Sequence, residues 1–327
     1  MKKIFLAVVA LAAMTACSND DVVSYDKGQA IAFGDAFVNN STRATDYTYG
    51  AVPLKSFNVY GTMTGAGNTV NIFNEVGLTG TVGNTTWSYT DPTTEEQYWL
   101  AKASYNFAAV VDATVTNPVS NYYMPTELAP VAAEDDKDSN FKDMLYATAT
   151  ATVSDQGVPS VADGIVNFTF EHLLSKVQFT VTSTATGSYS HSVTGIKVKN
   201  FATGTYDIAG ATWGEATPDT DISFGDIEGV NADSEETVGS TTISGKTNAI
   251  QQLLIPTTKD FTVSFNVETY LNGTLMSVEP KTVTVANDLV KGHSYNFTIA
   301  CAVNAPIKFS VTADPTWDST NGTVTVQ

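Results

Sequence analysis

Cysteine is nearly absent from the sequence. Only Cys17 and Cys301 occur in 327 residues, and Cys17 shortly follows the apolar run Ile4 to Ala13, which is typical of an export signal. If processing consumes Cys17, Cys301 has no partner, and the exported fold must hold without disulfides. Cys301 lies in an apolar run, Phe297 to Val303, which favours a small buried hydrophobic residue over a reactive thiol.

Basic residues and catalytic motifs are also scarce. Sixteen Lys and Arg stand against thirty-four Asp and Glu, a formal net charge of −18 with only 15% charged residues. This balance argues against binding nucleic acid or anionic lipid surfaces. The sequence has no Gly-x-Ser-x-Gly, no His-Glu-x-x-His and no phosphate loop, and His172, His191 and His293 lie far apart. We therefore expect no enzyme and no metal or other cofactor.

What is abundant points to β structure. Thr, Val, Tyr and Phe are prominent, amphipathic helical repeats are few, and 43% hydrophobic residues can fill two cores. The clearest strand is Phe261 to Tyr270, whose alternating Phe and Val residues would occupy one buried face. Asn272-Gly273 predicts a hairpin turn into Leu275 to Val278.

Two alternating runs lie in the middle of the chain. Ile165 to His172 and Lys176 to Thr182 are separated by Leu173 to Ser175, which predicts one bulged strand or two strands in series. His172 has no second ligand at metal-binding spacing, so we expect a hydrogen-bonded strand residue. The small, polar stretch Ser183 to Ser190 predicts a boundary between two domains.

Three further features have a functional and a simpler interpretation. The aromatic residues of Trp87 to Tyr89, Tyr98 to Leu100 and Tyr105 to Val111 could form a carbohydrate platform, but inward packing in a sandwich is favoured. Glu134 to Asp138 offers oxygens for calcium, yet it lacks the EF-hand spacing and glycine, which favours a solvated loop. Asp318 to Thr320 resembles the tripeptide O-glycosylated in secretory proteins of the Bacteroidetes, a match that arises often by chance.

The N-terminus has the pattern of a lipoprotein signal. Met1 to Lys3 is basic and Ile4 to Ala13 is apolar but too short to span a bilayer. The small residues before Cys17 resemble a bacterial lipobox, which predicts a signal peptide over residues 1–16 and acylation, such as palmitate, on Cys17. Ser18 to Asp21 resembles the acidic segment of surface-exported lipoproteins. Acyl chains on Cys17 would anchor the protein in the outer membrane.

Arg43 is the only arginine in the chain. It lies in the polar segment Asn39 to Asp46, so an arginine-specific protease would find a single site, between Arg43 and Ala44. Just upstream, Gln29 to Gly34 predicts a first strand. Cutting after Arg43 would discard both the lipid anchor and this strand. The alternative is an ordinary surface arginine.

Together these segments resemble the Bacteroidales fimbrillin family, including its Mfa-like members, which are subunits of type V pili. The residues that carry the resemblance cover essentially the whole chain: Cys17, Ile31 to Phe33, Ser41 to Ala44, Phe57 to Gly61, Tyr98 to Leu100, Tyr105 to Phe107, Phe170 to Val177 and Lys291 to Tyr295.

The resemblance implies an all-β fold of two tandem transthyretin-like β-sandwich domains. The expected division is a lipidated propeptide at 17–43, an N-terminal sandwich at 44–183 and a C-terminal sandwich at 184–327. In such pilins, cleavage removes a first strand and a C-terminal strand of another subunit takes its place. Here the displaced strand would contain Ile31, Ala32 and Phe33. The donor strand would lie within 318–327, at Val324, Thr325 and Val326.

The resulting expectation is a structural pilin of a fimbria, located at the outer membrane and cell surface and supporting adhesion. Its partners would be other copies of itself, related fimbrial subunits, an arginine-specific protease and a surface receptor. The sequence also allows two alternatives. One is a monomeric surface lipoprotein that binds glycans or proteins, for which Arg43 is irrelevant. The other is a fimbrial tip or adhesin subunit.

Overall fold

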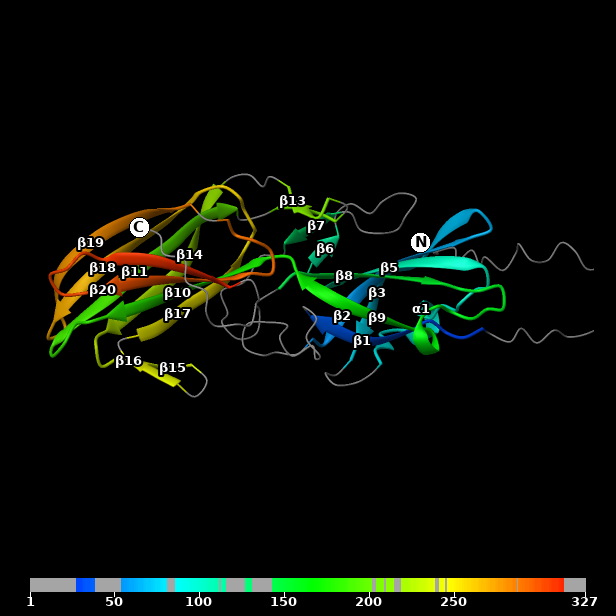
Figure 1. Cartoon of the computed structure of the whole chain (residues 1–327), viewed down its shortest axis with the longest axis horizontal. Coiled ribbons are helices and arrows are strands. Elements are labelled where there is room, and N and C mark those ends of the chain that lie inside the picture. Colours follow the sequence, from blue (N-terminus) through cyan, green and yellow to red (C-terminus); the bar gives the residue numbers. More distant parts are fainter. Residues whose placement is uncertain are drawn as a thin grey trace, which may run out of the picture.

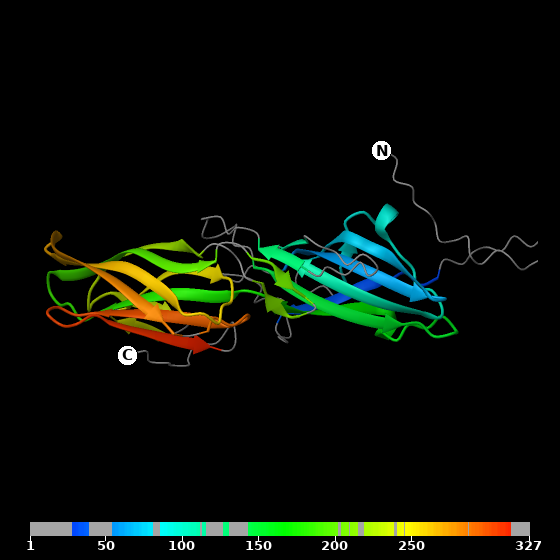
Figure 2. The ribbon, with the colours of Figure 1, turned by 90° about the horizontal axis from the view of Figure 1, so that it is seen from above.

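The protein is elongated and consists of two β-rich units placed end to end (Figures 1 and 2). The computed structural model describes residues 28–38, 54–80, 86–111, 113–115, 127–130, 143–201, 204–208, 210–214, 219–238, 241–244, 246–286 and 288–314. Its only helical elements in these ranges are α1 (Pro92–Glu95) and the 3-10 turn η3 (Ala162–Gly164). None of the described helices is long and apolar enough to cross a membrane.

The first unit is built on one seven-stranded sheet with the order β1-β9-β8-β5-β2-β3-β4. Alternation is clear in β9, where every second residue is buried, and the last five residues of β5 are all buried. The sheet encloses an aromatic-rich core. Its strands are β1 (Ala32–Val38), β2 (Ser56–Gly65), β3 (Asn68–Thr79), β4 (Ser88–Tyr89), β5 (Ala103–Val111), β8 (Leu145–Thr152) and β9 (Ile165–His172).

The second unit is a sandwich of two four-stranded sheets, with the orders β17-β10-β20-β21 and β14-β11-β18-β19. Its core lies between the sheets and contains the buried face of β18. The strands are β10 (Ser175–Ser183), β11 (Tyr189–Phe201), β14 (Asp219–Val230), β17 (Lys246–Leu254), β18 (Phe261–Leu271), β19 (Thr274–Val285), β20 (Ser294–Cys301) and β21 (Lys308–Asp314). A separate hairpin is formed by β15 (Glu235–Val238) and β16 (Thr241–Ser244).

A small sheet and a third apolar cluster join the two units. The sheet has the order β13-β12-β7-β6, with β6 (Ala113–Val115), β7 (Glu127–Pro130), β12 (Tyr206–Asp207) and β13 (Thr212–Trp213). The cluster contains Leu173 and Leu174, and the Trp213 indole N–H donates to the Leu173 carbonyl at 2.7 Å. Backbone pairing and shared apolar packing therefore both cross the junction.

The predicted strand at Phe261 to Tyr270 is confirmed as β18, and the turn at Asn272-Gly273 is confirmed as its link to β19. The two alternating runs around Leu173 are two strands in series, β9 and β10. The chain passes between the cores at Leu173 and Leu174, because β10 pairs with β17 and β20 of the second unit. The stretch Ser183 to Ser190, predicted as the boundary, connects β10 to β11 within that second unit.

Candidate functional site

The first strand is bonded on both of its edges. On one edge, β1 pairs in parallel with β9, from Ala32 opposite Ile165 to Val38 opposite Phe170. On the other, the segment that leads into β1 and its first residues bond antiparallel to Trp87 and to residues 97–99. The contacts are Ile31 N to Gln97 O at 2.8 Å, Trp99 N to Gln29 O at 2.9 Å and Trp87 N to Phe33 O at 2.9 Å.

These bonds make β1 the strand that closes the sheet. Trp87 directly precedes β4, which is the opposite edge of the seven-stranded order. Figure 1 shows β1 lying beside β9 along the lower side of the first unit. We call the position that β1 fills, between β9 and the segment formed by Trp87 and residues 97–99, the first-strand slot. A strand in this slot covers two sheet edges at once.

β9 depends on β1 for most of its backbone pairing. Its ladder with β8 contains only two described residue pairs, Leu145 with His172 and Tyr146 with Glu171, at the junction end. The rest of β9, from Ile165 to Phe170, pairs with β1. Removing β1 would therefore leave the backbone groups along one edge of this stretch without a partner, and buried groups in that state are costly.

Beneath the slot, the side chains of the first strand complete the core. Ile31 is 1% exposed and Phe33 is fully buried. The Phe33 ring lies 5.6 to 6.0 Å, centroid to centroid, from four aromatic rings, which belong to Phe73, Tyr89, Phe107 and Phe168. Such aromatic pairs add to the stability from burial alone. Phe33 is thus a central residue of the core, supplied by the strand that a cut after Arg43 would remove.

Polar contacts fix the start of the strand. The Tyr89 hydroxyl donates to the Ile31 carbonyl at 2.6 Å, and the Gln29 side-chain amide donates to the Asp163 carbonyl at 2.5 Å. Burial raises the pKa of Tyr89, with Glu96 adding to the rise, so the hydroxyl stays a neutral donor. Gly164 has a φ of +70°, and a Cβ there would collide with the Gln29 amide. Local backbone geometry thus makes room for the segment that enters the slot.

The predicted displaced residues are found together in this segment: Ala32 and Phe33 belong to β1, and Ile31 directly precedes it. Cys17, Arg43, Ala44 and the predicted donor residues Val324, Thr325 and Val326 lie outside the described residues, as do Glu134 to Asp138 and Asp318 to Thr320. Sequence reasoning did not identify the partners of the first strand, Trp87 and residues 97–99. Their signal in the sequence was aromatic: Trp87 to Tyr89 and Tyr98 to Leu100.

The other residues considered for binding or catalysis have packing and hydrogen-bonding roles in the structure. His172 is a hydrogen-bonded strand residue, as predicted: its Nδ1 lies 2.5 Å from Asp143 Oδ2, with both side chains buried. Trp99 is 4% exposed and packs on Tyr105, which confirms inward packing for this part of the aromatic run. Within the ranges that the structure describes, no group of three or more His, Cys, Asp or Glu side chains is placed to hold a metal ion.

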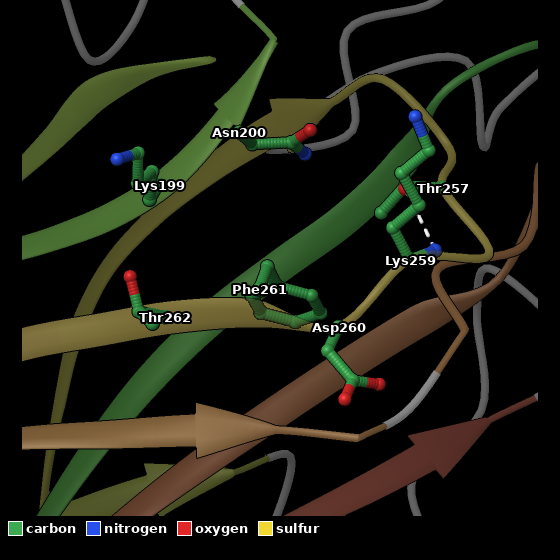
Figure 3. A pocket seen from close by; sticks show the side chains of 7 residues that line it. All are labelled: Lys199, Asn200, Thr257, Lys259, Asp260, Phe261 and Thr262. Atoms are coloured by element: carbon green, nitrogen blue, oxygen red, sulfur yellow. Dashed lines mark hydrogen bonds between the residues drawn. The ribbon is translucent and has the colours of Figure 1, made fainter.

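A small hollow of about 160 Å³ lies on the second unit. It is lined by Lys199, Asn200, Thr257, Lys259, Asp260, Phe261 and Thr262. Figure 3 shows these side chains projecting in different directions rather than converging on one point. The Asn200 amide donates to the Ile255 carbonyl at 3.1 Å, and Lys259 N donates to the Thr257 hydroxyl at 3.1 Å. These polar contacts hold the loop and do not define a ligand site.

The comparisons with known proteins agree with this architecture. The model of the fimbrillin-like family matches residues 42–315, most of the chain. The chain therefore belongs to the fimbrillin-like family. The match begins after β1, which ends at Val38. Among curated proteins, no sequence matches significantly.

Solved structures from Bacteroides share the fold. A fimbrial protein of Bacteroides vulgatus has a TM-score of 0.58 at 15% identity, covering 86% of this chain and 98% of its own. A candidate cell adhesion protein of Bacteroides ovatus has a TM-score of 0.57 at 16% identity, covering 90% and 99%. At these identities the likeness shows the all-β fold alone. Membership in the family supports a fimbrial subunit at the cell surface, and hence a structural role.

Proposed function

We propose that the protein is the structural subunit of a fimbria that is exported as a lipoprotein, cut after Arg43 and polymerised by strand exchange. Lipid on Cys17 would hold the precursor at the outer membrane. The cut would release the subunit from this anchor, because the discarded segment runs from Cys17 to Arg43. Assembly with other copies and related subunits would then build a surface fibre that supports adhesion.

The observation that carries the proposal is the position of β1. It ends at Val38, so all of it lies before Arg43, and yet it closes the first sheet and supplies Phe33 to the core. In the uncut precursor, β1 covers both edges of the slot, which keeps the subunit from pairing with its neighbours. After cutting, β1 is no longer covalently joined to the unit that it completes.

An emptied slot would favour a strand from another copy. The edge of β9 and the backbone of Trp87 and residues 97–99 would lack partners, and an apolar trough would open over Phe73 and Phe168. A donated strand restores the hydrogen bonds and the burial together, as in other cases of strand addition. Because the donor and acceptor surfaces differ, the contact is heterologous and grows an open filament.

The test uses the precursor without its signal segment, residues 18–327. Digestion with an arginine-specific protease is expected to cut once, after Arg43, to leave residues 44–327 folded and to yield polymers visible by electron microscopy and size-exclusion chromatography. Arg43→Lys is the matched control, because it keeps the charge but removes the only arginine. The same treatment should leave this variant monomeric.

Deletion of residues 322–327 tests the donor strand. The shortened protein should be cut normally but fail to grow polymers. Normal growth without these residues would place the donor elsewhere in the chain. Cut protein that stays folded and monomeric over days would contradict strand exchange altogether.

A further inference from the structure

The exposed large apolar residues of the described chain are unevenly distributed. Six are exposed by 41% to 63%: Leu100, Val158, Leu275, Met276, Val278 and Val290. Five of the six lie near the two opposite ends of the long axis, as shown below. Val290 lies near the junction, where its carbonyl accepts a hydrogen bond from the Ser175 hydroxyl at 2.8 Å. Exposed apolar residues that gather at one place on a soluble protein often mark an interaction surface.

Leu100 and Val158 lie at the free end of the first unit. β9 runs from Ile165 to His172, where the junction begins, so the loop before Ile165 is at the far end. The loop that holds Val158 is joined to the turn after Leu100 by hydrogen bonds from Lys102 N to Ser154 O at 3.3 Å and from Val153 N to Ala103 O at 2.8 Å. We call Leu100 and Val158 the first tip.

Leu275, Met276 and Val278 lie toward the free end of the second unit. β10 runs outward from the junction to Ser183, and the turn that follows it accepts a hydrogen bond at Ser188 O from Asn272 N at 2.9 Å. Asn272 is in the turn between β18 and β19, so the outer part of β19 lies at this end (Figure 2). We call Leu275, Met276 and Val278 the second tip.

The two halves of β19 differ in their protection against pairing. β19 is the last strand of its sheet in the described order, so its outer edge faces no described strand. The inner half carries Pro280 and a Glu279–Lys281 ion pair at 3.0 Å, features that discourage edge-to-edge association. The outer half, from Thr274 to Val278, has neither proline nor charge and exposes three large apolar side chains. This difference is expected if only the outer half of β19 contacts another protein and the inner half must avoid such contacts.

The direction of β1 indicates which copy would meet the first tip. The segment that leads into β1 starts beside this tip, since Gln29 O accepts from Trp99 N, next to Leu100. From there β1 runs parallel with β9 toward the junction. A replacement strand that keeps this direction, and so the hydrogen-bond pattern with β9, must enter the slot at the first tip. The donating copy would therefore lie beyond the first tip.

Chain length allows the donating copy to present its second tip there. The described chain ends at Asp314, which pairs with Ser294 at the junction end of β20, and thirteen residues follow. Extended, they would reach about 43 Å, of which about 26 Å would pass along the eight residues of β20 to the second tip. About five residues would remain to enter the slot of the next copy.

We propose that the second tip of one copy packs against the first tip of the next, in an end-to-end contact that is additional to the exchanged strand. The occupant of each tip is thus another copy of this chain, and the contact is heterologous. This inference rests on the proposed polymerisation. The apolar contact would align the two copies so that the short donor end reaches the slot, and it would add to the affinity of a brief strand.

The first experiment measures growth and strand insertion separately. Leu275→Ser with Met276→Ser, and Leu100→Ser with Val158→Ser, should each slow polymer growth of the cut protein by about tenfold or more, followed by light scattering. Val290→Ser is the matched control, an exposed apolar residue away from both tips, and should grow at the wild-type rate. A fluorescent peptide of residues 315–327 should bind every cut variant equally, because the slot itself is unchanged.

The outcomes separate this inference from the proposed function. Tip variants that bind the peptide but polymerise slowly support the contact. Tip variants that polymerise at the wild-type rate overturn it while leaving strand exchange intact. Wild-type cut protein that neither polymerises nor binds the peptide overturns strand exchange, and the tip contact, which rests on it, is overturned with it.

A second experiment tests the geometry directly. Cut Val158→Cys protein mixed with cut Met276→Cys protein should form mixed cross-linked dimers with a short bis-maleimide, whereas Val290→Cys mixed with either should not. Native Cys301 is buried and stays silent in this assay. Cross-links that join Met276→Cys only to itself would show a symmetric contact and overturn the head-to-tail arrangement.

Discussion

The two units of the molecule are closed in different ways. The second unit consists of two four-stranded sheets whose strands all lie between Ser175 and Asp314. The first unit is closed by β1, which precedes Arg43. A single cut at Arg43 would therefore disconnect an essential strand from the first unit and leave the second covalently complete. The difference predicts that cutting loosens one half of the molecule and spares the other.

The two units nonetheless share one hydrogen bond, in which a tyrosine hydroxyl accepts from the backbone N–H five residues before it. The Tyr105 hydroxyl accepts a hydrogen bond from Leu100 N at 2.8 Å, and the Tyr295 hydroxyl accepts one from Val290 N, also at 2.8 Å. Each tyrosine starts the same triplet, Tyr-Asn-Phe, in β5 and in β20. Beside Leu100, Trp99 N donates to Gln29 O of the segment that precedes Arg43. Beside Val290, the backbone N–H and carbonyl of Leu289 bond to the carbonyl and N–H of Thr257, which a cut at Arg43 would not remove. The same tyrosine contact thus lies beside the segment before Arg43 in the first unit and beside a segment after Arg43 in the second.

The largest expected effect is a loss of protection confined to the first unit. After cleavage and removal of the 18–43 fragment under conditions that keep the protein monomeric, amide hydrogen exchange along Ile165 to Phe170 should accelerate by more than about 100-fold. Loss of Phe33 alone corresponds to about 3–5 kcal/mol, and the β9 ladder is lost in addition. Amides of β20 should keep their rates, measured by mass spectrometry. Equal acceleration in β20 would show that the junction couples the units too tightly for this comparison.

Sequence periodicity predicted much of this fold because each strand encodes its own burial pattern. The alternation in Ile165 to His172 and in Phe261 to Tyr270 is visible without any partner. The apolar run at Gln29 to Gly34 also marked the start of the first strand, although β1 extends to Val38. What periodicity does not contain is pairing. That Phe33 meets Trp87 on one side and β9 on the other depends on contacts between residues more than fifty positions apart.

The boundary between the units illustrates a second limit. Small polar residues suit a flexible linker and a tight turn equally. Within Ser183 to Ser190, the residues Thr184 to Ser188 form the turn between β10 and β11. The true crossing, at Leu173 and Leu174, is apolar because both side chains are buried in the cluster that the units share. A connection between units that is buried in a core is apolar, so its composition does not mark it as a boundary.

A smaller effect should separate the units by mutation. Phe33→Ala and Phe297→Ala each remove a fully buried ring and should each lower the free energy of unfolding of the precursor by about 3–5 kcal/mol. After cleavage and removal of residues 18–43, the Phe33→Ala protein should become indistinguishable from cut wild type, because the residue has left. The Phe297→Ala deficit should persist. Urea unfolding before and after cutting measures both, and a Phe33→Ala deficit that survived removal of the fragment would contradict the assignment of β1 to the discarded segment.

The smallest effect concerns the hydrogen bond that Tyr89 gives to Ile31. Tyr89→Phe removes this donor and should lower the free energy of unfolding of the precursor by about 1 kcal/mol. Tyr295→Phe, which removes the hydroxyl that accepts from Val290 N in the second unit, should cost a similar amount both before and after cutting.

Burial raises the pKa of Tyr89, so the folded precursor keeps the hydroxyl proton while the unfolded chain loses it near pH 10. The contribution of Tyr89 is thus fully present below about pH 10 and is lost as pH rises further. The precursor carrying Tyr89→Phe should consequently lose less stability than wild type between about pH 10 and 11, measured by urea unfolding. An equal loss in both proteins would mean that the Tyr89 hydroxyl ionises as readily when folded as when unfolded, and that the first strand is not held by a protonated donor at this position.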